Sequence, residues 1–245
     1  MKRVAICIKG AVGKKDADDV RFCVPGDVYR VGEYIDYVAV RNSIFKHIIN
    51  VNPDYEFDFF LHGWNLDLSY NLTRIYEPKK HLFEDNTRYD TVITPTIVKS
   101  SDFGGVSGSL SIKKSIELKD IYEIEQNIKY DIVIVYRYDI LLWADMNLDM
   151  YDVTNSIYCN AWNGSCGGDF HFVMSHTNAN KFKYLYDSIS MYTNKYQYHT
   201  WIPNYVSNII KVNLREDNIY AGKCQEHMRV INNSEKLKTI LAGYL

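Results

Sequence analysis

The chain has 245 residues, of which 47% are hydrophobic and 24% are charged, and its formal net charge is -2 at pH 7. Such a length buries a sizeable core, and this composition is that of an ordinary globular protein. The near-neutral balance gives no argument for nucleic acid or a membrane surface as a partner. Five cysteines, an odd number without a CxxC pair, predict neither a disulfide framework nor a zinc site.

The N-terminal segment MKRVAICIKG carries an apolar run too short for a signal peptide, and no stretch is long enough to cross a bilayer. We therefore expect a cytoplasmic protein in a reducing environment, without a transmembrane segment. The sequons at Asn71, Asn163 and Asn232 would then stay unmodified.

Three short apolar segments predict buried strands in the first part of the chain. They are Val4–Ile8, Phe57–Leu61 and Ile132–Val135. The last is β-branched throughout and has no polar alternation, which is typical of a strand covered on both faces. Helical segments separate the three strands, so the order predicts one α/β domain of three layers with a mainly parallel sheet.

Apolar residues at helical spacing predict the other elements. Helices are expected at about 33–50, 66–76, 110–127, 178–189, 201–210 and 234–245, and further strands at 91–93, 157–161 and after Gly168. The segment 14–32 is expected to be a loop, and so are residues 77–80. Thr177 or Asn178 is expected to cap the helix that ends near 189.

The predicted helix at 110–127 is expected to bury Ile112, Ile116, Ile121, Ile124 and Ile128. Ser109 or Ser111 would cap it, which puts Lys113 and Lys114 in the first turn. Cations are unfavourable at that end of the helix dipole. A bound anion would relieve the conflict, and so would solvation of two exposed lysines.

Arg137 and Asp139 directly follow the third predicted strand. In open α/β sheets ligands bind in the crevice outside the carboxyl ends of the strands. A lone carboxylate on a rigid strand suits Mg²⁺ or Mn²⁺, which bind through one or two carboxylates and substrate phosphates. Arg137 would offset charge on a leaving diphosphate. The alternative is an ion pair that only bridges neighbouring loops.

Asp169 and His171 alternate with Phe170 and Phe172, which predicts that the two polar side chains share one face. After a Gly-Gly turn, such a pair can supply a general base for a hydroxyl nucleophile. The alternative is an Asp-capped turn beside a surface histidine.

Other candidate residues end strands or come late in the chain. The first strand ends in Lys9, Gly10 and Ala11, and glycine lets backbone N–H groups approach a phosphate; a plain tight turn is the alternative. His62 ends the second strand, and a histidine at such a position is more commonly packed in the core than bound to a ligand. His227 would complete a metal or phosphate site only if a late loop folded back.

Four segments then carry a resemblance in their order along the chain. They are the first strand ending in Lys-Gly, the run FDFFLHGW from Phe57, the run YDIVIVYRYD from Tyr130, and the run GDFHF from Gly168. The set resembles small nucleotide-sugar glycosyltransferase-like proteins of bacterial surface-polysaccharide clusters and large DNA viruses, including those of algae. In that group the patterns DxFxHxW and YDxVIRxRxD recur. The resemblance extends from about Val4 to about Tyr186.

The resemblance implies a GT-A-like fold with a nucleotide-binding half, about 1–140, and an acceptor-binding half, about 141–245. The implied activity is transfer of a sugar from a UDP- or GDP-linked donor to a glycan hydroxyl, with Mn²⁺ or Mg²⁺ as cofactor. If the transfer inverts, Asp169 deprotonates the acceptor hydroxyl; if it retains, Asp169 only positions the acceptor.

Site roles follow from the resemblance by position. The nucleotide sugar would contact Lys9, Gly10, Ala11, His62, Lys114, Arg137 and Tyr138. Asp169 and Arg137 would be catalytic, Asp139 and His227 would bind the metal, and His171 and Trp201 would bind the acceptor. The sequence departs from the pattern at Arg137, which stands where a DxD motif has its first acid.

Two alternatives remain. A sugar nucleotidyltransferase generally has a glycine-rich first loop followed by basic residues, which residues 10–15 match poorly. A non-catalytic glycan- or nucleotide-sugar-binding protein of the same fold would explain the missing first acid.

Overall fold

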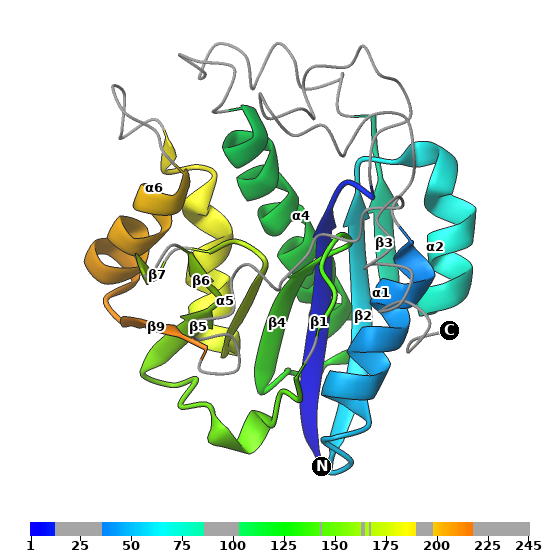
Figure 1. The fold of residues 1–245 in the computed structure, drawn as a ribbon, viewed down its shortest axis with the longest axis horizontal. Coiled ribbons are helices and arrows are strands. Elements are labelled where there is room, and N and C mark those ends of the chain that lie inside the picture. Colours follow the sequence, from blue (N-terminus) through cyan, green and yellow to red (C-terminus); the bar gives the residue numbers. More distant parts are fainter. Residues whose placement is uncertain are drawn as a thin grey trace, which may run out of the picture.

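The computed structural model describes residues 1–12, 36–85, 103–142, 144–162, 165–166, 168–189 and 198–217. The predicted loop at 14–32, strand at 91–93 and closing helix at 234–245 lie outside these residues, as does His227. Within them, a mixed sheet of seven strands carries helices on both faces (Figure 1).

The sheet has four parallel strands on one side and a mixed group on the other. Its strands are β1 (Lys2–Gly10), β2 (Tyr55–Gly63), β3 (Lys80–Phe83), β4 (Ile132–Arg137), β5 (Ser156–Cys159), β8 (His171–Ser175) and β9 (Asn213–Glu216). Their order is β3-β2-β1-β4-β8-β5-β9. The strands β1 to β4 are parallel, β8 is antiparallel to β4 and β5, and β9 is parallel to β5. A separate ribbon pairs β6 (Ala161–Trp162) with β7 (Ser165–Cys166).

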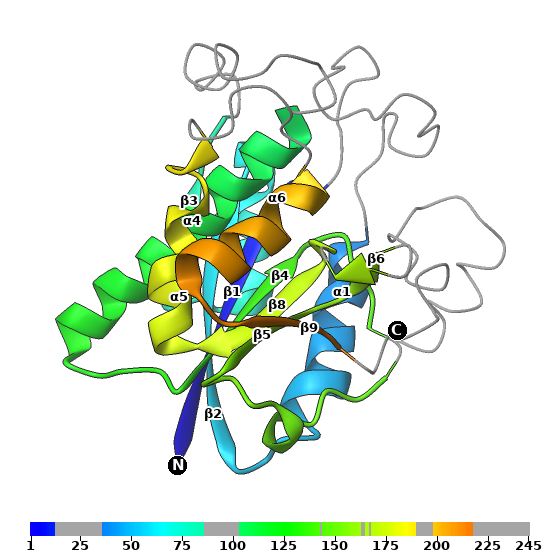
Figure 2. The same cartoon turned by 90° about the vertical axis from the view of Figure 1, so that its left-hand side faces the viewer.

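Helices cover both faces of this sheet. They are α1 (Tyr37–Ile44), α2 (Ser69–Tyr76), α4 (Phe103–Gln126), α5 (His176–Phe182) and α6 (Tyr198–Tyr205). Short π-helical segments extend α1 and α6 at Phe45–Ile49 and Val206–Ile210, and 3₁₀ turns lie at Leu66–Leu68, Leu148–Met150 and Lys183–Leu185. Figure 2 shows α4, α5 and α6 on one side of the sheet and α1 on the other.

Two buried clusters fill the spaces between sheet and helices. Alternation along β1 sends Ile6 and Ile8 into the cluster beneath α1 and α2, and Cys7 into the cluster beneath α4, α5 and α6. The strand β4 divides its side chains in the same way, which is why its sequence shows no polar alternation. The predicted α/β architecture with helices on both faces of a mainly parallel sheet is therefore confirmed.

Among the described residues, the sequence patterns missed the two edge strands. The strand β3 begins at Lys80 within the predicted loop, and β9 alternates exposed and half-buried residues. Edge strands bury little, so they lack the apolar run that marked β1, β2 and β4. The cap of α5 is Ser175 rather than Thr177 or Asn178, because the Ser175 hydroxyl accepts the N–H of Asn178.

The helix α4 begins at Phe103, well before the predicted cap at Ser109 or Ser111. Ser109 lies inside the helix and donates its hydroxyl to the carbonyl of Gly105 one turn earlier. Lys113 and Lys114 therefore lie in the middle of the helix, and the predicted conflict with the helix dipole does not arise.

The buried face of α4 also differs from the prediction. Ile112 and Ile116 are fully buried, but Ile121 is 46% exposed and Ile124 is 81% exposed. A step of five residues turns a side chain by about 140° around the helix axis, so Ile121 leaves the buried stripe. Lys119 and Glu123 continue that stripe instead, and their buried side chains form an ion pair at 2.7 Å.

None of the helices in the described part of the chain combines the length and the apolar character needed to span a bilayer.

Candidate functional site

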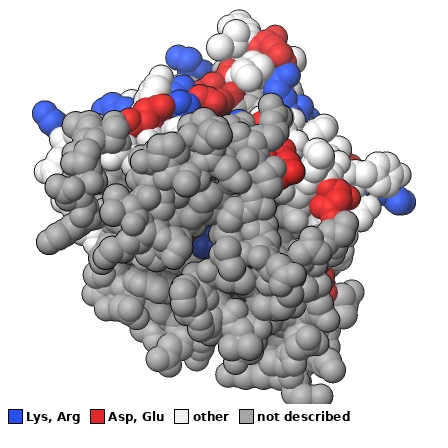
Figure 3. All heavy atoms as spheres, turned by 90° about the horizontal axis from the view of Figure 1, so that it is seen from above, with Lys and Arg blue, Asp and Glu red and all other residues white. Residues whose placement is uncertain are grey.

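The carboxyl ends of β1, β2 and β4 lie together at the top of the view in Figure 1. Figure 3 looks down onto this end of the molecule. Where described residues are visible on this face, basic and acidic side chains are intermixed. The described residues visible on this face therefore form no patch of a single sign.

Three polar side chains form a row across these strand ends. Lys9 of β1 pairs in register with His62 of β2 and with Arg137 of β4. Residues in register on neighbouring strands point to the same face, and this is the face that α4 covers. The mainly parallel sheet expected from the sequence therefore brings these three strand ends side by side.

An ionic cluster of Lys9, Arg137, Asp139 and Asp169 lies at the β1 and β4 end of the row. Arg137 donates through Nε to Oδ1 of Asp139 at 2.6 Å and through Nη2 to Oδ2 at 2.5 Å. Its Nη1 donates to Oδ2 of Asp169 at 2.8 Å, and Nζ of Lys9 is 3.7 Å from the same oxygen. Two cations thus balance two carboxylates.

Burial sets the protonation of Lys9, whose side chain is 2% exposed. Loss of hydration lowers the pKa of Lys9 from 10.5 to about 8; Asp169 raises it in part, and the positive charge of Arg137 lowers it further. Lys9 is therefore mostly a cation at neutral pH, but it is close to titrating.

The backbone around Asn160 holds Asp169 in place. Asn160 accepts the N–H of Gly168 on its carbonyl, at 3.2 Å, and the N–H of Phe170 on its side-chain oxygen, at 2.9 Å. A Cβ on Gly168 would be only 2.1 Å from Nδ2 of Asn160. Only glycine fits this close approach, which places the carboxylate of Asp169 beside Arg137.

A second set of buried groups, the His62 network, comprises Gly10, His62, Glu84, Ser111 and Lys114. Ser111 Oγ accepts the N–H of Gly10 at 2.8 Å and lies 2.6 Å from Nδ1 of His62. Nε2 of His62 is 3.3 Å from Glu84, which also accepts from Lys114 at 2.5 Å. The bonds are consistent when Ser111 donates to Nδ1 and His62 donates from Nε2 to Glu84.

The His62 network is structural as it lies. Burial lowers the pKa of His62, so the ring is neutral. His62 and Ser111 are completely buried, so Ser111 offers no accessible nucleophile. The anion beside Lys114 is the carboxylate of Glu84, a residue of the chain itself. Gly10 has φ +102°, which favours glycine, and its carbonyl accepts the N–H of Trp64.

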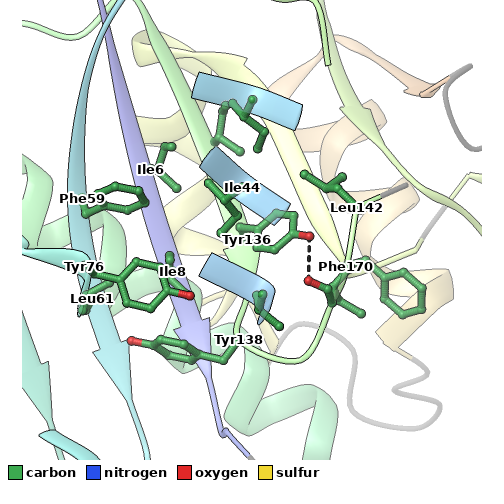
Figure 4. Close-up of a cluster of buried hydrophobic side chains, with 14 of the residues drawn as sticks. Ile6, Ile8, Ile44, Phe59, Leu61, Tyr76, Tyr136, Tyr138, Leu142 and Phe170 are labelled. Carbon is green, nitrogen blue, oxygen red and sulfur yellow. Dashed lines mark hydrogen bonds between the residues drawn. The ribbon is translucent and has the colours of Figure 1, made fainter. Parts of the chain in front are cut away.

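The predicted contact of Tyr138 with a nucleotide sugar is not supported. Tyr138 is completely buried in the cluster beneath α1 and α2, and its ring meets that of Tyr76 edge-on at 6.3 Å (Figure 4). Tyr136 lies in the same cluster and donates its hydroxyl to the carbonyl of Ile140. Tyrosine in this stretch is a core residue with a polar tip.

The predicted acceptor residues also lie in the interior. His171 is 1% exposed, and its Nε2 lies 3.3 Å from Asp217, which accepts the hydroxyl of Tyr151. Trp201 is 2% exposed and packs on Tyr205 along the buried face of α6. Both assignments are therefore corrected: neither side chain is on a surface that an acceptor glycan reaches.

The prediction that Asp169 and His171 share a face is wrong as well. Phe170 belongs to the cluster beneath α1 and α2, whereas Phe172 belongs to the opposite cluster. The strand begins only at His171, so the alternation assumed for Asp169 does not hold. Asp169 turns instead toward Arg137.

The described residues do not fit a divalent metal ion as they lie. Both oxygens of Asp139 and one oxygen of Asp169 accept hydrogen bonds from Arg137, and Asp139 is 3% exposed. Across the described ranges, no three His, Cys, Asp or Glu side chains are grouped so that they could hold a metal ion. The assignment of Mn²⁺ or Mg²⁺ stays a prediction from the motifs.

A separate hollow of about 670 Å³ lies beside β9. It is lined by Asn155, Pro203, Ser207, Lys211, Val212, Asn213 and Leu214. These residues supply no carboxylate, imidazole or thiol, and the hydroxyl of Ser207 and the amine of Lys211 have no acid or base beside them in this lining.

No family model matches the chain, and the comparison with curated proteins found no match. The functional assignment therefore depends on the geometry of the ionic cluster and on the resemblance carried by the sequence motifs.

Sequence patterns did not indicate these contacts of Ser111, Glu84 and Asn160. The partners of Ser111 and Glu84 are 22 or more residues away along the chain, and those of Asn160 are 8 and 10 residues away. Gly168 was the available signal for Asn160, because a glycine beside a candidate acid often marks a close backbone approach. The hydroxyl of Ser111 had no comparable signal.

Proposed function

We propose that the protein is a GT-A-like glycosyltransferase that moves a sugar from a UDP- or GDP-linked donor to a glycan hydroxyl. The observation that carries this proposal is the ionic cluster at the carboxyl ends of β1 and β4. Open α/β sheets bind their ligands at this edge. Fold alone does not define function, so the chemistry of Lys9, Arg137 and Asp169 has to support the assignment.

Arg137, whose side chain is 14% exposed, would meet a leaving diphosphate, and the buried ammonium of Lys9 would add positive charge behind it. Both belong to rigid strands, so their N–H groups are oriented before the reaction begins. A nucleoside diphosphate at this edge would also meet the backbone of Gly10 and Ala11, where the first strand ends.

Asp169 is the group best placed to meet the acceptor hydroxyl. Arg137 and Lys9 stabilise its ionised form, and Gly168 and Asn160 fix its backbone. In an inverting transfer, the hydroxyl proton passes to Asp169 as the oxygen bonds to the anomeric carbon and the bond to the diphosphate breaks. In a retaining transfer, Asp169 accepts a hydrogen bond and positions the hydroxyl.

The proposed setting is the cytoplasm. The buried thiols of Cys7 and Cys159 agree with a reducing compartment.

The test is a panel of UDP- and GDP-sugars added to the purified protein, with thermal unfolding and release of UDP or GDP as measurements. We expect one donor to raise the unfolding temperature and to be hydrolysed slowly without acceptor. Formation of a nucleotide sugar from UTP or GTP and a sugar 1-phosphate would indicate a nucleotidyltransferase instead.

A second candidate is a non-catalytic nucleotide-sugar- or glycan-binding protein of the same fold. The observation that favours it is the charge balance of the ionic cluster, in which Arg137 occupies both oxygens of Asp139. Such a protein would be stabilised by a glycan or a nucleotide sugar and would release no UDP or GDP over many hours.

A further inference from the structure

The guanidinium of Arg137 bridges two carboxylates. Three hydrogen bonds from Arg137 reach both oxygens of Asp139 and one oxygen of Asp169, at 2.5 to 2.8 Å. The side chains of all three residues are at least 86% buried. A planar guanidinium matches this geometry because its donors lie in a fixed fork.

A divalent ion between Asp139 and Asp169 would need the same oxygen lone pairs. Mg²⁺ demands near-ideal geometry and binds carboxylates whose oxygens are open to it. Arg137 does not vacate the position by losing its proton, since arginine stays charged in proteins. The ammonium of Lys9, 3.7 Å from Asp169, opposes the arrival of further positive charge.

We propose that Arg137 is the resident cation of this site and takes the place of a divalent metal ion between Asp139 and Asp169. This proposal deepens the proposed function, and one consequence of it, for sugar transfer, rests on that function. The charge on the leaving diphosphate is then stabilised by Lys9 and Arg137, and sugar transfer proceeds in the presence of EDTA.

Titration of the nucleotide-free protein with Mn²⁺ tests the proposal, with free Mn²⁺ measured by electron paramagnetic resonance. The wild-type protein is expected to bind no Mn²⁺ in the ionic cluster. Arg137→Ala should bind Mn²⁺ at least tenfold more tightly, because it leaves two carboxylates facing an open space. Adding Asp139→Asn to this variant should remove the new site.

The matched control is Arg41→Ala. This change removes a guanidinium that stacks on Phe45, with Cζ 3.5 Å from the ring centroid, and it should not create a Mn²⁺ site. A gain of equal size in this control would mean that losing any arginine increases Mn²⁺ binding, and it would overturn the proposal.

Two further results would overturn it. One is Mn²⁺ binding by the wild-type protein that Asp139→Asn abolishes, and the other is a folded Arg137→Ala variant that binds Mn²⁺ no more tightly than wild type. If Arg137→Ala does not fold, Arg137→Lys replaces it, since one ammonium cannot reproduce the fork and a smaller gain is expected. If neither variant folds, the wild-type titration with Asp139→Asn decides.

The assay contains no nucleotide, so its failure differs from that of the proposed function. A protein that transfers no sugar, but whose Arg137→Ala variant gains a Mn²⁺ site, would reject the transferase and keep the resident cation. A transferase that binds Mn²⁺ through Asp139 would keep the proposed function and reject Arg137 as the resident cation.

Discussion

Lys9 shows how one buried side chain connects a candidate site to stability. Its strand places it in register with Arg137 and with its ammonium 3.7 Å from the carboxylate of Asp169, and burial withdraws that ammonium from water. The lowered pKa of Lys9 means that the folded protein disfavours the charged form of this side chain. Below about pH 8 Lys9 is charged in both the folded and the unfolded chain. The folded state then carries the full free-energy cost of burying the ammonium.

We expect the stability cost of Lys9 to diminish as the pH rises. Its pKa is about 8 in the folded protein and 10.5 in the unfolded chain, so between these values the unfolded chain binds more protons and stability increases with pH. A change from 10.5 to about 8 corresponds to about 3 kcal/mol. The free energy of unfolding in urea is compared for wild type and Lys9→Met at pH 7.5 and at pH 9.5. Between the two pH values, the difference between the proteins should change by about 2 kcal/mol in favour of wild type. Parallel curves for the two proteins would contradict this account of Lys9.

Ser111 is a second residue whose role the structure makes testable. Ser111→Ala leaves the N–H of Gly10 and Nδ1 of His62 without this partner inside the protein, and such a loss costs about 1–3 kcal/mol. Ser115→Ala is the control, since Ser115 is equally buried on α4 but bonds only to the carbonyl of Ile112 one turn before it. Urea denaturation should show the larger loss for Ser111→Ala. Equal losses would mean that the His62 network contributes little to holding the end of β1.

The residues of the site could be predicted only in part. Arg137 and Asp139 are two positions apart on a strand end, so their pairing was visible in the sequence. The approach of Asp169 depends on β8 running antiparallel beside β4, which no local pattern encodes. Burial of Tyr138 and Trp201 was equally hidden, because an aromatic ring suits a core and a sugar site alike.

Among the elements, α4 shows that the spacing of apolar residues predicts a helix but not which of its residues are buried. The predicted stripe of isoleucines followed residue type, and it crossed from the buried face to the exposed face after Ile116. The buried positions near the end of the helix are occupied by Lys119 and Glu123, which neutralise each other and also contact His176 of α5. A buried ion pair of this kind does not appear in a hydrophobic pattern.

Two substitutions on α4 test which face is buried. Ile116→Ala should cost about 2–5 kcal/mol, because it opens a cavity under a fully buried side chain. Ile124→Ala should change stability by less than about 0.5 kcal/mol, since that side chain is 81% exposed. The measurement is the free energy of unfolding in urea, and a cost above 2 kcal/mol at Ile124 would contradict the orientation of the helix.

At the scale of the whole molecule, the prediction of an α/β architecture succeeded for a physical reason. Strands buried on both faces are apolar on both faces, so β1 and β4 appear in the sequence as unbroken apolar runs, and β2 as a run interrupted by Asp58. The strands β3 and β9 lie at the sheet edges and bury less, and their places in the order depend on long-range pairing. The ends of β1, β2 and β4 were correctly placed at one edge of the sheet, because that edge follows from their parallel order.

The most direct test of the proposed function compares sugar transfer by wild type, Asp169→Asn and Asp187→Asn. Asp187 is a partly exposed acid that pairs with Lys113, away from the ionic cluster, and serves as the control. We predict that wild type and Asp187→Asn release UDP or GDP from the same donor at similar rates. Asp169→Asn should still be stabilised by that donor but should lose at least about 10²-fold in kcat. Wild-type kcat in Asp169→Asn, or a wild-type protein that neither binds nor consumes any UDP- or GDP-sugar, would contradict the proposal.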